Sequence, residues 1–214
     1  TNDKTNMTTT ITCTNNINNG VINVTGDSAA TVIVGGIMGR YINYLSNFTN
    51  CHNTANISAT LGSSTLVDMA GSSSPVGYDT AATNCSNSGD ISLKLTGDTD
   101  ADATSYSCIG GCFGYWSHVH QANITVTNCD NSGDISVTSE GTIKGQYHLG
   151  GVAGCLYGRV TVENCENTGE SVKFVGNTVN HITCVGGLVG RGAVRAVNQA
   201  GEDYVATNVF TMKS

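Results

Sequence analysis

Four acidic side chains stand at corresponding places in two successive repeats of the sequence and could do chemistry together: Asp130, Asp134, Glu166 and Glu170. If the repeats stack as parallel strands, the carboxylates stack too, and a pair about 5 to 9 Å apart can serve as acid and base in glycoside hydrolysis. Stacked carboxylates also bind calcium, for which Asp134 and Glu170 are the weak candidates. The sequence shows no Lys or Arg as a base or substrate clamp beside them, so a solvated face is the simpler expectation.

Cysteines form a second recurring set, Cys13, Cys51, Cys85, Cys129 and Cys165, and we expect them in one column. Buried Cys behaves as a small hydrophobe, so the column is predicted to be an inward stack of thiols. Neighbouring coils would bring the Cα atoms within about 4.4 to 6.8 Å, which is the range for a disulfide bond. An occasional disulfide is therefore an alternative, although the parallel Cβ vectors of a column disfavour it as a rule.

A zinc-like set is conceivable from Cys108, His148 and Cys184, which align in one further column. Their spacing matches no standard finger or ribbon. The outer two would lie about two coil heights apart, nearly 10 Å. We therefore expect no metal there.

A small aromatic patch is formed by Trp116, His118 and His120. The two histidines point the same way if the segment is extended. A sugar-stacking or metal role competes with an ordinary surface loop, which is the simpler expectation.

The elements that must position these groups recur every 34 to 44 residues, counted from cysteine to cysteine. Most units carry a glycine pair in an apolar run, an Asn-Cys pair and then an x-Asn-x-Gly turn; residues 66–71 are a worn copy of the glycine run. The asparagines before the cysteines are predicted to form a buried ladder of amide hydrogen bonds: Asn50, Asn84, Asn128 and Asn164. The turn glycines Gly89, Gly133 and Gly169 suit a positive φ.

Short runs with period 2, broken by Asn-x-Gly turns, predict strands, and no window shows a helical period. A unit of about 36 residues cannot bury its apolar side alone, whereas stacked units can. We therefore predict one all-β domain over residues 1–214, a parallel β-solenoid (β-helix) of about five to six coils with three short strands per coil. Residues 8–24 and 204–211 are expected to form terminal strands that lack caps.

The Val185-Gly-Gly-Leu-Val-Gly190 run, its copies and the Asn-Cys-x-Asn-Ser/Thr-Gly units resemble the GLUG motif repeat of bacterial surface proteins and adhesins. The resemblance covers about residues 31 to 205. It implies a right-handed, secreted or surface-exposed β-helical module, and it carries no catalytic residues.

Composition narrows the function further. A formal charge of −7 with nine Lys and Arg leaves no basic patch for nucleic acid, and no apolar run approaches the ~20 residues of a membrane span. We expect a non-enzymatic extracellular or cell-surface module without a cofactor, either adhesive or structural, as a stalk or a filament subunit. Its partners would be its own copies stacked end to end, neighbouring domains, or glycans. The alternative is a polysaccharide lyase or hydrolase using the acidic set.

Overall fold

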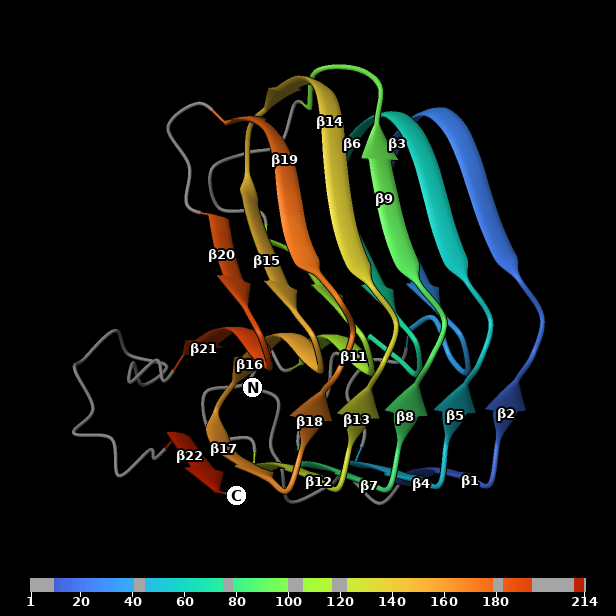
Figure 1. Cartoon of the computed structure of the whole chain (residues 1–214), viewed down its shortest axis with the longest axis vertical. Coiled ribbons are helices and arrows are strands. Elements are labelled where there is room, and N and C mark those ends of the chain that lie inside the picture. Colours follow the sequence, from blue (N-terminus) through green and yellow to red (C-terminus); the bar gives the residue numbers. More distant parts are fainter. Residues whose placement is uncertain are drawn as a thin grey trace.

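Alternating apolar and polar residues place one side of each strand inside, and the result is an all-β solenoid whose sheets are built from parallel strands (Figure 1). The computed structural model describes residues 10–40, 45–74, 79–99, 106–116, 123–178, 183–193 and 210–213. The predicted fold class is thereby confirmed. The right-handed sense and the number of coils stay predictions.

The coils contribute strands to four sheets. The base sheet contains, in order, β1 (Thr10–Thr14), β4 (Leu45–Thr49), β7 (Thr80–Thr83), β12 (Asn123–Thr127), β17 (Arg159–Glu163) and β22 (Phe210–Lys213). The riser sheet contains β18 (Glu166–Asn167), β13 (Asp130–Asn131), β8 (Ser86–Asn87), β5 (His52–Asn53) and β2 (Ile17–Asn18). The ledge sheet contains β11 (Phe113–Trp116), β16 (Ala153–Tyr157) and β21 (Val189–Ala193).

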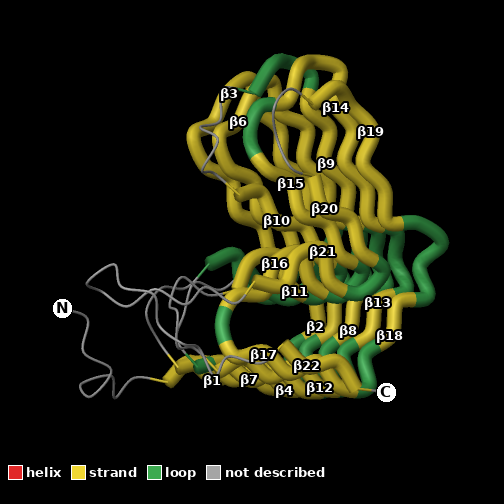
Figure 2. The backbone as a smooth tube through the Cα atoms, turned by 90° about the vertical axis from the view of Figure 1, so that its left-hand side faces the viewer, coloured by secondary structure: helices red, strands yellow, loops and turns green. Residues whose placement is uncertain are grey.

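The largest sheet, the arch sheet, climbs away from the riser and returns to the ledge (Figure 2). Its order is β19 (Val172–Thr178), β14 (Ile135–Ile143), β9 (Ile91–Leu95), β6 (Ile57–Ala70), β10 (Tyr106–Gly110), β15 (Gln146–Gly150) and β20 (Thr183–Gly186), and β3 (Ile22–Gly35) pairs with β6. The coil from 123 to 157 therefore contains five strands, not the three predicted. The extra strands arise because the glycine pair ends one strand and begins the turn to the next, and because a two-residue riser strand follows each Asn-Cys pair.

Two apolar cores fill the solenoid, one on each side of a narrow waist. The lower core lies between the base and ledge sheets, where the rings of Phe48 and Phe113 meet edge to face at 6.3 Å. The upper core lies between the two legs of the arch sheet and includes Ile91, Ile109 and Leu149. Burial of these side chains supplies the main driving force for stacking the coils.

The waist is where an asparagine ladder meets a glycine ladder. In the riser, each amide donates to the next side-chain oxygen at 2.7 Å, through Asn18, Asn53, Asn87, Asn131 and Asn167. Opposite stand Gly36, Gly71, Gly111 and Gly151: a Cβ at Gly111 would lie 2.1 Å from the Gly151 oxygen and 2.4 Å from the Asn131 side chain. Only glycine fits here, which explains the second glycine of each pair.

The prediction assigned the buried ladder to the wrong asparagine of the repeat. It named the asparagine before each cysteine, whereas the asparagine two residues after the cysteine is the buried one. The chain of bonds does exist, since Asn84 donates to Asn50 at 3.3 Å and Asn128 to Asn84 at 3.0 Å, but it lies at the surface. Each of these residues has a φ near +52°, as do Asn15 and Asn164. Asparagine tolerates this left-handed conformation better than other non-glycine residues do, so the first Asn of the motif makes a bend and the second fills the waist.

The expected positive φ at the turn glycines is also wrong. Within the described chain, the glycines with a positive φ are Gly145 and Gly158. Gly89 and Gly133 are required for close approach instead, because a Cβ on either would lie 2.1 Å from a carbonyl oxygen of the neighbouring coil.

The register of the first coil differs from the predicted alignment. In the base sheet Cys13 lies opposite Phe48. Asn16, and not Cys13, is therefore the residue next to Cys51. Cys13 is nevertheless 8% exposed and lies in the lower core. The positive-φ bend at Asn15 sets this register, since Asn15 donates its backbone N–H to Thr49 as Asn50 does to Thr83.

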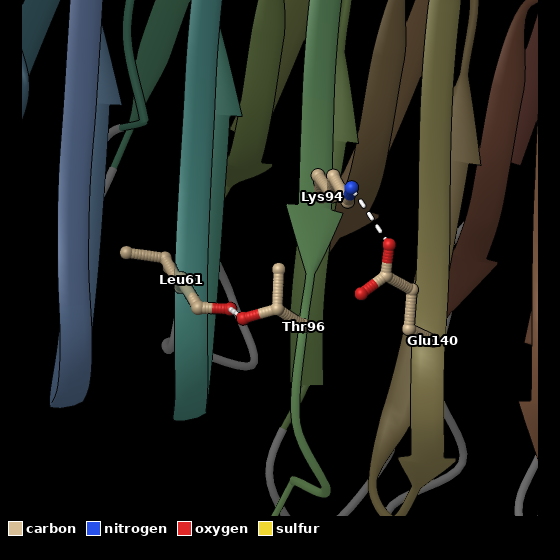
Figure 3. A network of polar contacts seen from close by, with 4 residues as sticks. All are labelled: Leu61, Lys94, Thr96 and Glu140. Carbon is tan, nitrogen blue, oxygen red and sulfur yellow. Dashed lines mark hydrogen bonds and ion pairs between the residues drawn. The ribbon is translucent and has the colours of Figure 1, made fainter.

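The outer face of the arch sheet adds weaker links between coils (Figure 3). Lys94 of β9 pairs with Glu140 of β14 at 2.7 Å, and the Thr96 hydroxyl donates to the Leu61 carbonyl at 3.2 Å. The two charged side chains are about half exposed, so their pair contributes little stability. Of the predicted terminal strands, residues 8, 9 and 204–209 lie outside the described residues. The described part of these segments contains β1, β2, the beginning of β3 and the first two residues of β22.

Candidate functional site

Acidic residues line a groove along the solenoid, at the bend between the riser and arch sheets. The groove encloses about 370 Å³, and its walls are two parallel columns of polar side chains. One column includes Asp90 and Asp134, the other Ser92, Ser136 and Lys173. Lys173 thus lines the same groove as two carboxylates, and sequence reasoning had not found this cation there.

The carboxylates of the groove are engaged with the backbone of the adjacent coil. Asp90 Oδ1 accepts the N–H of Asp134 at 3.0 Å, and Asp134 Oδ1 accepts the N–H of Ser171 at 2.9 Å. On the riser, Asp130 Oδ1 accepts the N–H of Glu166 at 3.1 Å. Each of these carboxylates therefore satisfies a backbone donor at the bend, which is a structural role.

The four predicted acidic residues do not form one site. Asp130 and Glu166 are paired in the riser and do not line the groove. Ser171, not Glu170, lies opposite Asp134, because one extra residue separates Asn167 from Val172 compared with the preceding coil. Across the described ranges, no three His, Cys, Asp or Glu side chains are placed to hold a metal ion. Calcium at Asp134 and Glu170 stays a prediction.

The cysteine column runs along the lower core. Cys51, Cys85 and Cys129 are buried, Cys165 is half-buried, and all are free thiols. The thiols of Cys129 and Cys165 donate to the carbonyls of Thr127 and Glu163, both at 3.4 Å. Each thiol thus bonds to the last residue of the strand that precedes it, β12 or β17.

Cys165 differs from most of the column in both pKa and exposure: a hydrogen bond from the Cys129 side chain lowers the pKa of Cys85 and of Cys165, but Cys85 is buried whereas Cys165 is half-buried. This bond lowers the pKa of Cys165 to about 7, and the backbone N–H of Cys129 also donates to its sulfur at 3.4 Å. Burial raises the pKa of Cys13 and Cys51 instead. The thiolate, which is the reactive form, is therefore most accessible at the end of the column.

A third cluster occupies the re-entrant corner between the descending leg of the arch sheet and the ledge sheet, visible beside β15, β20, β16 and β21 in Figure 2. Cys108, His148 and Cys184 are in register there, as their alignment predicted. Cys108 also bonds to its neighbours: its N–H donates to the buried Asp68 carboxylate at 3.0 Å, and its thiol contacts Cys155. Burial raises the pKa of Asp68 to about 7.

The polar centre of this corner is Arg191. Its Nη1 donates to Gln146 Oε1 at 2.8 Å and lies 3.1 Å from His148 Nε2. The guanidinium carbon lies 5.1 Å from the Tyr106 ring centroid and 5.7 Å from that of Tyr157. These contacts hold the guanidinium in one position by hydrogen bonds and cation–π attraction.

His148 is fully buried in the corner, and desolvation, together with the Arg191 charge, lowers its pKa to about 4. Because an arginine N–H can only donate, Nε2 must accept and Nδ1 must carry the proton. Among the described residues this Nδ1 has no hydrogen-bond partner.

Sequence reasoning missed Arg191 and the tyrosines. One signal was present: Tyr115, Cys155 and Arg191 follow the last glycine of three successive glycine units and pair in register. The predicted patch fared differently, since His118 and His120 lie outside the described residues, as does the side chain of Trp116.

Comparisons with family models, with curated proteins and with solved structures found no match. No helix in the described part of the chain has the length and apolar character to cross a membrane.

Proposed function

We propose that this chain is a non-enzymatic structural and adhesive module, a right-handed β-solenoid of five to six coils that acts outside the cell or on its surface as a stalk or filament subunit. One observation carries the proposal: the carboxylates suited to acid–base chemistry are bonded to backbone N–H groups of the next coil, as Asp134 is to Ser171. The resemblance to GLUG repeats supports the location.

Stacking of copies end to end is supported by the distribution of exposed apolar residues. Two of the large hydrophobic side chains that are exposed in the described chain, Val185 and Met212, belong to the last coil and continue columns whose inner members are buried. Val185 is 47% exposed and Met212 51%, whereas their inner neighbours Leu149 and Val162 are 0% and 2% exposed.

A second copy would continue the same columns. The edge strands pair in parallel with their inner neighbours, so a copy added head to tail extends every sheet in register. Such a contact joins two different surfaces and does not close on itself, so it generates an open filament.

Negative-stain electron microscopy and light scattering over a concentration series test this function. We expect filaments or particles that grow with concentration, and we expect Val185→Lys to abolish them because it buries a charge at the contact. Val175→Lys is the matched control, since Val175 belongs to the same coil but its side chain faces outward from the upper core. A stable monomer at every concentration would overturn the stacking role.

A second candidate, a carbohydrate-active enzyme, is supported by the groove in which Lys173 accompanies Asp90 and Asp134. Parallel coils lie about 4.8 Å apart, near the ~5 Å carboxylate separation of retaining glycosidases. Depolymerisation of acidic polysaccharides with and without calcium tests it. Activity of the parent chain that is lost in Asp134→Asn would show that the chain is an enzyme. Inactivity on all substrates would favour the non-enzymatic structural module.

A further inference from the structure

The re-entrant corner holds a guanidinium that has no carboxylate partner in the described part of the chain. Among the described residues, Arg191 contacts two polar side chains, Gln146 and His148, and two rings, Tyr106 and Tyr157. Both hydrogen bonds use Nη1. Nε and Nη2 therefore retain N–H donors, arranged in the planar fork that matches a carboxylate.

The corner is also pre-organised. Arg191 is half-buried. Its guanidinium is held by the hydrogen bond to Gln146 of β15 and by the tyrosine rings. His148 is fully buried behind the guanidinium, and its Nε2 lies 3.1 Å from Arg191 Nη1, so it supports the arginine from inside the protein.

Aromatic rings border the guanidinium. Tyr106 stacks on His148 at 5.8 Å, and the Tyr157 ring lies 6.2 Å from Tyr106 and 5.9 Å from Tyr115. Tyr106 and Tyr157 are half-buried, so each presents part of a ring to solvent. A tyrosine face is apolar with a polar hydroxyl at its tip, which suits a ligand that has both C–H faces and hydroxyl groups.

We propose that this corner binds the carboxylate of an acidic sugar residue, with Arg191 holding the carboxylate and Tyr106 and Tyr157 bordering the sugar ring. The formal charge of −7 disfavours a polyanion, so the ligand is a single uronic-acid-type residue of an otherwise neutral glycan. Gln146 and His148 act as positioning residues for the guanidinium. This proposal rests on the adhesive part of the proposed function and is independent of stacking.

The test is titration of the full chain, by NMR or calorimetry, with methyl glucuronide, methyl glucoside, acetate and an N-acetylated dipeptide with a free C-terminus. We expect the glucuronide to bind at one site and the neutral glucoside to bind at least about tenfold more weakly, because it lacks the charge-assisted pair. Acetate that binds as tightly as the glucuronide would overturn the role of the sugar. Tighter binding of the dipeptide would assign the corner to a protein terminus instead.

Variants locate the site. Arg191→Gln should weaken glucuronide binding at least about tenfold, and Tyr157→Leu should weaken glucuronide and glucoside alike. Lys173→Gln is the matched control in the acidic groove and should leave binding unchanged, while an unchanged melting temperature shows that each variant is folded. Arg191→Lys covers the case in which Arg191→Gln does not fold. The proposal is overturned if the parent chain does not bind glucuronide. It is also overturned if binding is lost in Lys173→Gln and kept in Arg191→Gln. Light scattering measures stacking separately.

Discussion

Replacing Asn131 by alanine removes three hydrogen bonds from the waist at once. The side chain is fully buried, donates to Gly133 and to Asn167, and accepts from Asn87, all at 2.7 Å. Asn87 keeps its second bond, to Gly89. The buried Gly133 carbonyl and the half-buried Asn167 side-chain oxygen lose the Asn131 donor.

The magnitude follows from these two abandoned acceptors. An unsatisfied buried polar group costs about 1 to 3 kcal/mol, so Asn131→Ala should lower the free energy of unfolding by about 2 to 5 kcal/mol. That is a large fraction of the ~5 to 15 kcal/mol typical of a domain. Asn128→Gly is the matched control, because it removes an exposed ladder bond and glycine adopts the φ of 52° freely. It should cost less than about 1 kcal/mol.

Urea unfolding followed by circular dichroism measures both variants against the parent chain. The reasoning predicts a midpoint that is clearly lower for Asn131→Ala and nearly unchanged for Asn128→Gly. Equal losses in the two variants, or a larger loss in Asn128→Gly, would refute the assignment of the waist as the place where the ladder matters.

Three further predictions concern other buried groups. Gly111→Ala should lower the free energy of unfolding by at least about 2 kcal/mol, because the added Cβ would meet the Gly151 oxygen. Gly187→Ala should be nearly neutral, because no atom lies within 4 Å of a Cβ added there. Equal unfolding midpoints of the two variants would contradict this. Asp68, whose pKa rises to about 7 on folding, binds a proton that the unfolded chain releases near pH 4, so stability should fall as pH rises from 4 to 7. Asp68→Asn should remove that loss, up to about 4 kcal/mol at pH 8, and a parent-to-variant difference independent of pH would refute it. Of the cysteine column, Cys165 should react first with iodoacetamide at pH 7, as mass spectrometry of the labelled peptides would show, and earlier labelling of the buried thiols would contradict its assignment.

Parallel stacking could be predicted because residues that recur at a fixed spacing must lie in columns if each unit is to bury its apolar side. The alignment of Cys108, His148 and Cys184 followed from the same reasoning, and register pairing confirms it. The first coil broke the rule. There the bend at Asn15, rather than Cys13, sets the register, and one-residue shifts of this kind leave no trace in hydrophobic periodicity.

The sequence by itself determined that this chain is a stack of parallel strands with polar and thiol ladders, because period 2 and the repeat are local properties. It did not determine which asparagine of the motif enters the waist, since Asn128 and Asn131 are equally polar and only the approach of Gly111 from the opposite wall distinguishes them. Nor did it bring Arg191 to Tyr106, 85 positions earlier. That contact depends on the angle between the arch and ledge sheets, which arises from packing across the corner and not from any segment alone.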